Sequence, residues 1–271
     1  MKQTEALSPE RLDWLAARRR EGQRIALWRL VLILAFFAFW EICAAAGLID
    51  PFLMSSPSRI AAATLRLARQ GNLLPHIVIT CMETVAGFLL GTGLGAAIAM
   101  LLWWTPRFAR VMEPILVVLN SLPKIALGPI FIVWMGPGVG AIIVMGLAVS
   151  LITTVLEVYH GFSRTDPDKI RLVECMGGSR RQVFFKVVAP SNLPALVNAL
   201  KVNVGLSWVG VIVGEYLVSR AGLGYLIVYG GQVFRLDLVM ASVIILGALA
   251  AVMYLGVVWL EKRITAAMLA A

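Results

Sequence analysis

Residues 139–161 read VGAIIVMGLAVSLITTVLEVYHG, an apolar stretch whose one residue among Asp, Glu, Lys and Arg is Glu157. A membrane-spanning helix needs about 20 such residues. The rest of the chain has the same character, because 60% of its 271 residues are hydrophobic and only 14% are charged, whereas a soluble domain carries roughly 25% charged residues. A mean hydropathy of +0.86 excludes a soluble globule and a disordered chain. The sequence therefore predicts an all-α integral membrane protein.

Six stretches of the chain are long and apolar enough to cross a bilayer. They divide it into a cytosolic N-terminal segment 1–29 with an amphipathic helix, a transmembrane domain 30–260 and a cytosolic tail 261–271. A further amphipathic helix is expected on the outer surface from Ser58 to Gly71, with Ile60 and Leu67 on one face. The six expected spans are 30–49, 80–103, 112–135, 139–161, 193–218 and 236–260.

Basic residues set the orientation of these spans. The chain has 24 Lys and Arg against 15 Asp and Glu, a net charge of +9. In one orientation seventeen basic residues fall in segments 1–29, 104–111, 162–192 and 261–271, against five on the opposite side. Because Lys and Arg accumulate on the cytoplasmic side, both termini and the 162–192 loop are predicted to be cytosolic. No basic stripe alternates with aromatic residues, so the expected partners of these charges are membrane lipids and no nucleic acid.

The third span carries polar residues at helical spacing. Asn120, Lys124 and Gly128 recur at intervals of four, with Ser121 beside them. Either Lys124 reaches an interface or pairs with a carboxylate, or it belongs to a polar row that lines a pathway. An irregular backbone is also expected, because proline removes a donor and disfavours helix before it. The prolines in and beside this span are Pro114, Pro123, Pro129 and Pro137.

Rows of small or polar residues mark the second and fifth spans. Gly87, Gly91 and Gly95 recur every four residues and predict close packing against another helix. Two rows lie on roughly opposite sides of the fifth span, which predicts a helix enclosed within the bundle. One row can contact a pathway and the other a neighbouring helix, and the sequence leaves open which does which. The rows are Lys201, Gly205, Trp208, Ile212 and Glu215, and Asn203, Ser207, Gly210 and Gly214. The candidate pathway residues are Asn120, Ser121, Lys124, Gly128, Lys201, Trp208 and Glu215.

The 162–192 loop has the signals of two short helices. With its flanks it reads GFSRTDPDKIRLVECMGGSRRQVFFKVVAPSNLP over residues 161–194. Asp166 or Thr165 can cap a first helix with Pro167 in its first turn. Gly177-Gly178 ends that helix, because glycine accepts left-handed backbone angles. The sequence predicts a rigid helix–turn–helix in the cytosol.

The second helix of this loop is expected to begin at a capping box formed by Ser179 and Gln182 and to stop at Pro190 and Pro194. Its apolar residues either pack on the protein's own bundle or form a ridge that docks into the groove of a soluble partner. The side chains concerned are Val183, Phe184, Val187 and Val188, with Arg180, Arg181 and Lys186.

Several motifs resemble those of binding-protein-dependent ABC importer permeases. In the loop these are Asp166-Pro167-Asp168, Gly177-Gly178-Ser179, the helix 183–188, Pro190 and Pro194, although Arg171-Leu172-Val173 replaces the Glu-Ala-Ala of that family. The sulfonate, taurine and nitrate branch is similar in further motifs. These are LMSSPS at 53–58, SLPKIALGP at 121–129, WMG at 134–136, GEY at 214–216 and AGLG at 221–224.

This resemblance implies a type I ABC importer permease with six transmembrane helices in the bacterial cytoplasmic membrane. It implies a second permease chain in a homodimer, two cytosolic ATPase subunits that bind ATP and Mg²⁺, and an extracytoplasmic solute-binding protein. The solute would be a small oxyanion such as an alkylsulfonate, taurine or nitrate. It assigns ATPase coupling to the loop residues Asp166, Pro167, Glu174, Gly177, Gly178, Ser179, Arg180, Arg181, Phe184 and Pro190.

The residues themselves predict no catalytic site, no metal site and no cofactor bound by this chain. No lysine follows a glycine, so the phosphate-binding pattern G-x-x-x-x-G-K-[ST] is absent from the sequence, and ATP hydrolysis is expected on another polypeptide. The alternative is an ion-coupled secondary carrier in which Glu157, Glu215 and Lys124 form a proton relay. No inverted repeat of the kind that many such carriers contain is evident.

Overall fold

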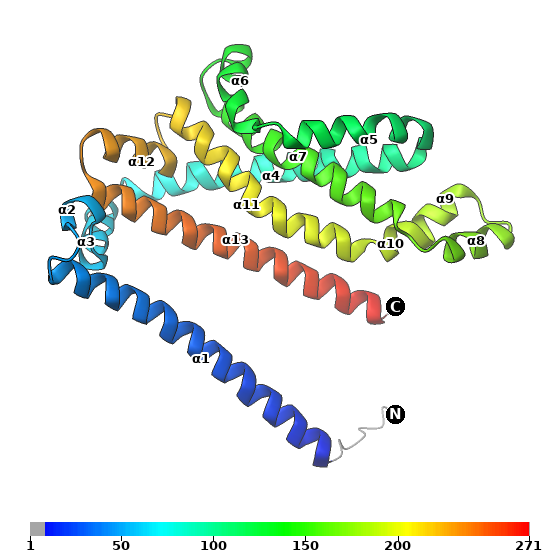
Figure 1. The fold of residues 1–271 in the computed structure, drawn as a ribbon, viewed down its shortest axis with the longest axis horizontal. Coiled ribbons are helices and arrows are strands. Elements are labelled where there is room, and N and C mark those ends of the chain that lie inside the picture. The colour runs from blue at the N-terminus through cyan, green and yellow to red at the C-terminus, as the bar shows by residue number, and fades with distance from the viewer. Residues whose placement is uncertain (1–8, 271) are drawn as a thin grey trace.

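The computed structural model describes residues 9–270, and within this range it is entirely helical apart from turns (Figure 1). Five helices are long and apolar enough to cross a membrane, and a bent pair makes a sixth candidate span. The five helices are Arg20–Ala45 (within α1), Leu73–Trp104 (α4), Val139–Ser163 (α7), Leu193–Val218 (α11) and Leu236–Ile264 (within α13). The bent pair is Pro106–Ser121 and Lys124–Met135. The six predicted spans are therefore present as helices. The helices are α1 Pro9–Ala45, α2 Pro51–Met54, α3 Pro57–Arg69, α4 Leu73–Trp104, α5 Pro106–Ser121, α6 Gly128–Met135, α7 Val139–Ser163, α8 Pro167–Cys175, α9 Arg180–Val183, α10 Ala189–Ser191, α11 Leu193–Val218, α12 Leu223–Gln232 and α13 Leu236–Ala270, with a 3₁₀ turn Lys124–Leu127 and a π turn Phe184–Val188.

A three-helix core of α4, α7 and α11 forms the centre of the bundle. The predicted glycine stripe of α4 lies against α7. A Cβ atom on Gly95 would meet Thr154 Cβ at 2.6 Å, and one on Gly91 would overlap Ser150 Oγ. Helix α7 therefore approaches α4 closely because no side chain separates them, as the spacing predicts.

Helix α11 is only partly enclosed, because Val202, Val209 and Tyr216 are exposed. Both predicted rows contribute buried residues, Trp208 and Glu215 from one and Asn203 and Ser207 from the other, so the structure does not reserve either row for a pathway. Asn203 Nδ2 donates to Thr92 Oγ1 at 3.1 Å and to Thr154 Oγ1 at 2.5 Å, which joins α11 to both other core helices. Further along this row, a Cβ on Gly210 would lie 2.7 Å from Gly146 Cα.

The third span is broken where its prolines predict. Helix α5 meets the segment Lys124–Met135, which contains the 3₁₀ turn Lys124–Leu127 and α6, at 84°. Leu122 is extended, because Pro123 disfavours helical angles at the residue before it. Pro114 lies inside α5, which continues past it. The bend, rather than a straight span, brings the polar residues near position 124 to the surface of α7.

The expected amphipathic helix within 1–29 is not a separate element. Helix α1 runs from Pro9 through the first span to Ala45, because no proline and only Gly22 interrupts it; residues 1–8 and 271 lie outside the described part. Helix α1 stands apart from the bundle and contacts α3 (Figure 1). Glu41 joins the two, accepting from Ser58 N at 2.9 Å and from Ser58 Oγ at 2.7 Å. Helix α3 itself begins at Pro57, capped by Ser56, one residue before the predicted start.

Helix α12 was not predicted from the sequence. Its first turn is held by side chains of two core helices. Gly222 N donates to His76 Nδ1 at 2.8 Å, Leu223 N to Thr80 Oγ1 at 2.8 Å, and Gly224 N to Glu215 Oε2 at 2.5 Å. Gly222 precedes this helix with a φ of +111°, a backbone angle that favours glycine. The glycine at this position is therefore the sequence signal that could have indicated the helix start.

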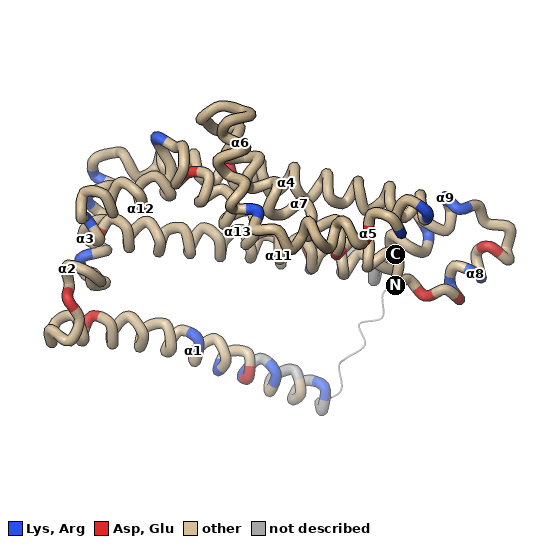
Figure 2. Tube along the Cα trace, turned by 45° about the horizontal axis from the view of Figure 1, so that its top comes forward, with Lys and Arg blue, Asp and Glu red and all other residues tan. Residues whose placement is uncertain are grey.

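Charged residues gather at the two ends of the bundle (Figure 2). One end carries α8 and α9, and the other carries α2 and α3. Helix α1 begins, and α13 ends, at the end that carries α8 and α9 (Figure 1). This distribution matches an apolar belt between two polar surfaces.

Candidate functional site

The segment 165–191, here called the hairpin, projects from one end of the bundle (Figure 1). Its first arm, α8, begins as predicted: Asp166 Oδ1 accepts from Asp168 N at 2.9 Å, with Pro167 in the first turn. It ends in a Schellman motif, in which Gly177 N donates to Glu174 O and Gly178 N donates to Val173 O, both at 2.9 Å. Both ends of this arm are therefore fixed by local hydrogen bonds.

The second arm begins at the predicted capping box. Ser179 N donates to Gln182 Oε1 at 2.7 Å and Gln182 N to Ser179 Oγ at 3.4 Å. The prediction that Pro190 stops this arm is wrong. The π turn Phe184–Val188 precedes it, and the helical backbone continues through Pro190 to the end of α10 at Ser191.

An aromatic cluster fixes the second arm to the bundle. We call Trp103, Trp104, Phe162 and Phe184 the aromatic anchor. The ring centroid of Phe184 lies 4.9 Å from Trp103, 6.0 Å from Trp104 and 5.4 Å from Phe162, and Phe184 is only 3% exposed. Of the two interpretations of the apolar ridge, packing on the protein's own bundle therefore holds for Phe184, and also for Val183 and Val188.

Arg180 also contributes to the attachment of the second arm to the bundle. Its Nη2 donates to Trp103 O at 2.9 Å, and its guanidinium lies 5.2 Å above the ring of Trp103. Such cation–π contacts add to the stability of the packed rings. The hairpin thus joins the end of α4 through the anchor and the end of α7 through Phe162.

A different set of side chains is available to a partner. Met176 at the tip is 80% exposed and Leu172 is 62% exposed. Phe185, next to the anchor in sequence, is 53% exposed, and the guanidinium of Arg181 lies 5.9 Å from its ring centroid. Phe185 lies outside the ridge that residue spacing predicts for the second arm, and Leu172 and Met176 belong to the first arm, for which the sequence predicted no docking residues.

A polar patch lies at the bend between α5 and α6. Lys124 Nζ donates to Asn120 O and to Asn120 Oδ1, both at 3.0 Å, and Thr153 Oγ1 of α7 donates to the same Oδ1 at 3.2 Å. Between residues 9 and 270 no carboxylate forms an ion pair with Lys124. Ser121 is exposed beside it. Thr153 was missed, because only the bend brings α7 to this position.

The other four candidate pathway residues lie elsewhere. Gly128 is buried, and a Cβ on it would meet Met145 Cε at 2.7 Å. Lys201 forms an ion pair with Glu261 of α13 at 2.7 Å. Trp208 is buried in the hydrophobic core, and Glu215 caps α12 from a position that is 1% exposed. The structure therefore does not join them to Lys124 in one polar row.

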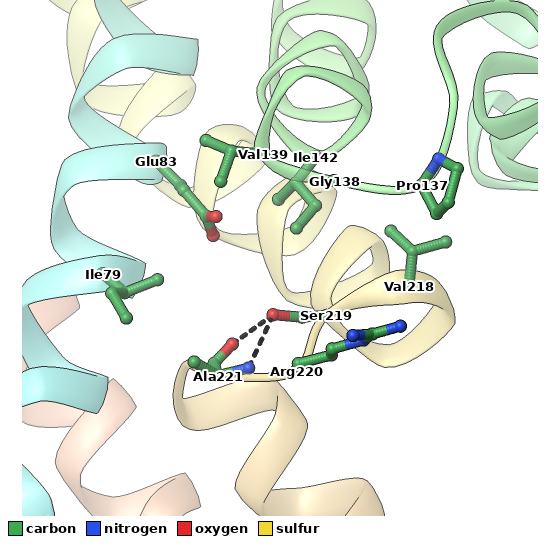
Figure 3. Close-up of a pocket in the computed structure, with 10 residues that line it drawn as sticks. All are labelled: Ile79, Glu83, Pro137, Gly138, Val139, Ile142, Val218, Ser219, Arg220 and Ala221. Atoms are coloured by element: carbon green, nitrogen blue, oxygen red, sulfur yellow. Dashed lines mark hydrogen bonds between the residues drawn. The ribbon is translucent and has the colours of Figure 1, made fainter.

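A cavity of about 520 Å³ lies between α4, α7 and the loop that follows α11 (Figure 3). Glu83 points into it and is the one acidic side chain among its described lining residues. Ser219 holds the loop in shape by accepting from Ala221 N at 3.1 Å. The remaining walls are mainly apolar, so this cavity could hold a small solute at the end of the bundle opposite the hairpin.

In the described part of the chain no cluster of three or more His, Cys, Asp and Glu side chains could hold a metal ion. The geometry is that of a membrane bundle with an attached, exposed hairpin. A family model described as "Binding-protein-dependent transport system inner membrane component" matches residues 87–266. The chain belongs to this family of ABC importer permeases. The permease is accordingly a multi-pass protein of the inner membrane and a transport component instead of a catalytic enzyme.

Relatives of the permease include transport permeases named for different solutes. It is 30% identical over 200 residues to the formylaminopyrimidine transport permease protein ThiX of Halalkalibacterium halodurans, with 74% of this chain and 79% of that protein covered. It is 27% identical over 233 residues to the putative aliphatic sulfonates transport permease protein SsuC of Bacillus subtilis, with 85% and 84% covered. The predicted resemblance to the sulfonate branch is thus supported by a named relative.

The fold also matches that of solved structures. A chain of the MetNI methionine ABC transporter in an inward-facing conformation has a TM-score of 0.64 and 20% identity to the permease, covering 72% of this chain and 97% of that one. The fold is that of a type I ABC importer permease.

Proposed function

We propose that this permease passes a small oxyanion across the membrane by alternating access, driven by ATP hydrolysis on separate subunits. The hairpin carries this proposal. Its first arm is fixed at both ends by hydrogen bonds, its second arm is packed through Phe184 against α4 and α7, and its tip is exposed. A rigid, anchored element transmits a partner's displacement to the helices that it contacts instead of absorbing it.

The proposed partner at the tip is a pair of cytosolic ABC ATPase subunits, which hold the ATP and Mg²⁺. The exposed apolar side chains of Leu172 and Met176 suit a groove on such a partner. Arg181, also exposed, can form an ion pair at its rim. Phe184 and Arg180 act differently from a docking residue, because they join the hairpin to α4.

A second copy of the permease completes the pathway in this proposal. Exposed apolar side chains on α5 and α6 flank the polar patch of Lys124 and Asn120, and a self-complementary interface there would enclose it. These side chains include Val118, Val133 and Trp134. The extracytoplasmic binding protein would deliver solute at the end opposite the hairpin, where the Glu83 cavity lies, and both termini would be cytosolic.

The charge of Lys124 supports an anionic solute. Its ammonium group has neutral hydrogen-bond partners and no carboxylate within the described chain, so an anion would be the charge partner that it lacks. An alkylsulfonate, taurine or nitrate would supply one. Of the two named relatives, SsuC fits this chemistry better than ThiX.

Reconstitution tests the whole proposal. The permease is co-purified with its ATPase from the host and placed in proteoliposomes, and ATP hydrolysis and uptake are measured with candidate binding proteins and sulfonates. We expect uptake that requires ATP and the binding protein and that is insensitive to a protonophore. Uptake that persists without the ATPase and collapses with the protonophore would instead establish an ion-coupled carrier.

The role of the hairpin is tested at Gly177. This residue has a φ of +79° and open space around its Cβ position, so Gly177→Val strains the backbone by about 1–3 kcal/mol without creating a clash. We expect this variant to separate ATP hydrolysis from uptake or to prevent ATPase assembly. Gly177→Asn, which accepts the same angles more readily, is the matched control. Normal uptake by Gly177→Val would contradict the coupling role.

A further inference from the structure

A second cavity, of about 250 Å³, lies where α3, α4, α12 and the start of α13 meet. It is at the end of the bundle opposite the hairpin (Figure 1) and on different helices from the Lys124 patch. Its volume falls below the roughly 300–1,000 Å³ of a drug-sized site. Because one water molecule takes about 30 Å³, the cavity has room for a single tetrahedral ion and a few water molecules.

The polar lining of this cavity consists of hydrogen-bond donors. None of its described lining residues is acidic. Side chains of these types can all donate to an oxyanion, and the two arginines add positive charge. The donors include Arg66, Gln70, Asn72, His76, Tyr225 and Arg235.

The two arginines differ in how far their charge is neutralised. Arg66 Nη2 donates to Asp237 Oδ2 at 2.9 Å. For Arg235, only the backbone is engaged within the described chain: its N–H donates to Gly230 O at 2.7 Å, while no carboxylate or carbonyl there accepts from its exposed guanidinium. A guanidinium without a partner, beside a cavity lined by other donors, is the arrangement that binds phosphate or sulfonate groups.

His76 contributes a donor of fixed identity. Its Nδ1 accepts from Gly222 N at 2.8 Å, so a neutral His76 ring carries its hydrogen on Nε2. The ring stacks on Tyr225 with centroids 6.1 Å apart, and the two planes lie at 14°. Packing and a backbone hydrogen bond thus orient this ring at the wall of the cavity.

We propose that this cavity binds a phosphate-type oxyanion, carried either by the headgroup of a membrane lipid or by an ion free in solution. The long apolar helices α4 and α13 begin beside it, which places the cavity at the depth of lipid headgroups. The site does not depend on the transport proposal, because its residues take no part in the hairpin or in the polar patch.

The test uses the full-length permease purified in detergent. Native mass spectrometry follows the retention of added phosphatidylglycerol and of a phosphate-free glycolipid, and thermal unfolding is measured with and without inorganic phosphate. We expect wild-type protein to retain phosphatidylglycerol at least tenfold more than the glycolipid. Stabilisation by inorganic phosphate without lipid retention would instead identify the free ion as the occupant of the same site.

The Arg235→Gln variant removes the unpartnered charge, and Arg69→Gln is the control, since Arg69 is likewise an exposed arginine but lies in the last turn of α3, outside the cavity lining. We expect Arg235→Gln to reduce retention about tenfold or to abolish the phosphate shift, with Arg69→Gln unchanged. The two variants should unfold at the wild-type temperature when no ligand is added. Equal retention of both lipids with no phosphate shift in wild type, or wild-type binding by Arg235→Gln, would overturn the proposal.

Discussion

Phe184 and Phe185 are neighbours in the chain but lie in opposite environments. Phe184 is buried between Trp103 and Phe162, whereas Phe185 faces solvent. Replacing the first with alanine should cost about 3–5 kcal/mol, because it leaves a cavity among the rings. We expect Phe184→Ala to lower the unfolding temperature of the purified permease and Phe185→Ala to leave it nearly unchanged. Equal shifts for the two variants would show that the anchor is not a stabilising contact.

Lys124 offers a second residue-level prediction. If its ammonium group receives an anionic solute, Lys124→Gln removes a charge-assisted hydrogen bond of about 1.5–3 kcal/mol, or roughly 10- to 100-fold in affinity. Uptake assays in proteoliposomes should show this loss in the apparent KM, with ATPase assembly intact. Ser121→Ala, at the neighbouring exposed position, is the control. A Lys124→Gln variant with wild-type KM would remove this residue from the pathway.

Residue roles could be predicted from spacing only in part. The spacing of Asn120 and Lys124 predicts two side chains that meet, and they do. The same reasoning failed to distinguish Lys201 and Trp208 from pathway residues. Helical periodicity shows which side chains share a face, but the partner that covers this face, Glu261 in one case and the hydrophobic core in the other, comes from tertiary packing.

At the scale of elements, the glycine stripe of α4 gives a matched comparison. A side chain on Gly95 would press on Thr154, whereas Gly93 of the same helix has open space around its Cβ position. Overpacking typically costs about 1–3 kcal/mol. Gly95→Val should therefore lower the unfolding temperature and the yield of folded protein, measured by size-exclusion chromatography after heating. If Gly93→Val is equally harmful, helix propensity rather than packing is responsible.

The local signals of helix ends were the most reliable part of the sequence. Asp166, Ser179 and Gly177 each act in the cap that their positions predict. Pro190 misled because the π turn before it lets the arm continue. Helix α12 was missed because the hydrogen bonds at its start come from His76, Thr80 and Glu215, which are remote in sequence.

At the scale of the whole molecule, the exposed Cys175 on α8 and the half-buried Cys43 at the other end of the molecule allow a test of which end meets the ATPase. A photo-crosslinker attached to Cys175, in a variant that lacks Cys43 and Cys81, should capture a nucleotide hydrolase in cells. The same reagent at Cys43 should not. Capture is read by immunoblot and mass spectrometry. Absence of a nucleotide hydrolase from the Cys175 product would contradict the coupling proposal.

The overall architecture followed from hydropathy and charge, since the six predicted spans are helices and the charged residues lie at the two ends. The position of α1 did not. Its sequence is as apolar as that of the core helices, yet no residue of its most apolar stretch is buried within the described chain. Apolar composition predicts that a helix enters a bilayer. It does not predict whether lipid or other helices surround that helix, because both are apolar neighbours.

The way α12 is fastened limits how the molecule can deform. Three of its amide groups are bonded by side chains of α4 and α11, so sliding α12 alone would leave three donors unsatisfied, at about 1–3 kcal/mol each where they are buried. We therefore expect α12 to move together with α4 and α11 as one rigid unit. Conformational change is then expected at the bend at Pro123, where α5 meets the segment Lys124–Met135 at 84° and no continuous helix opposes bending.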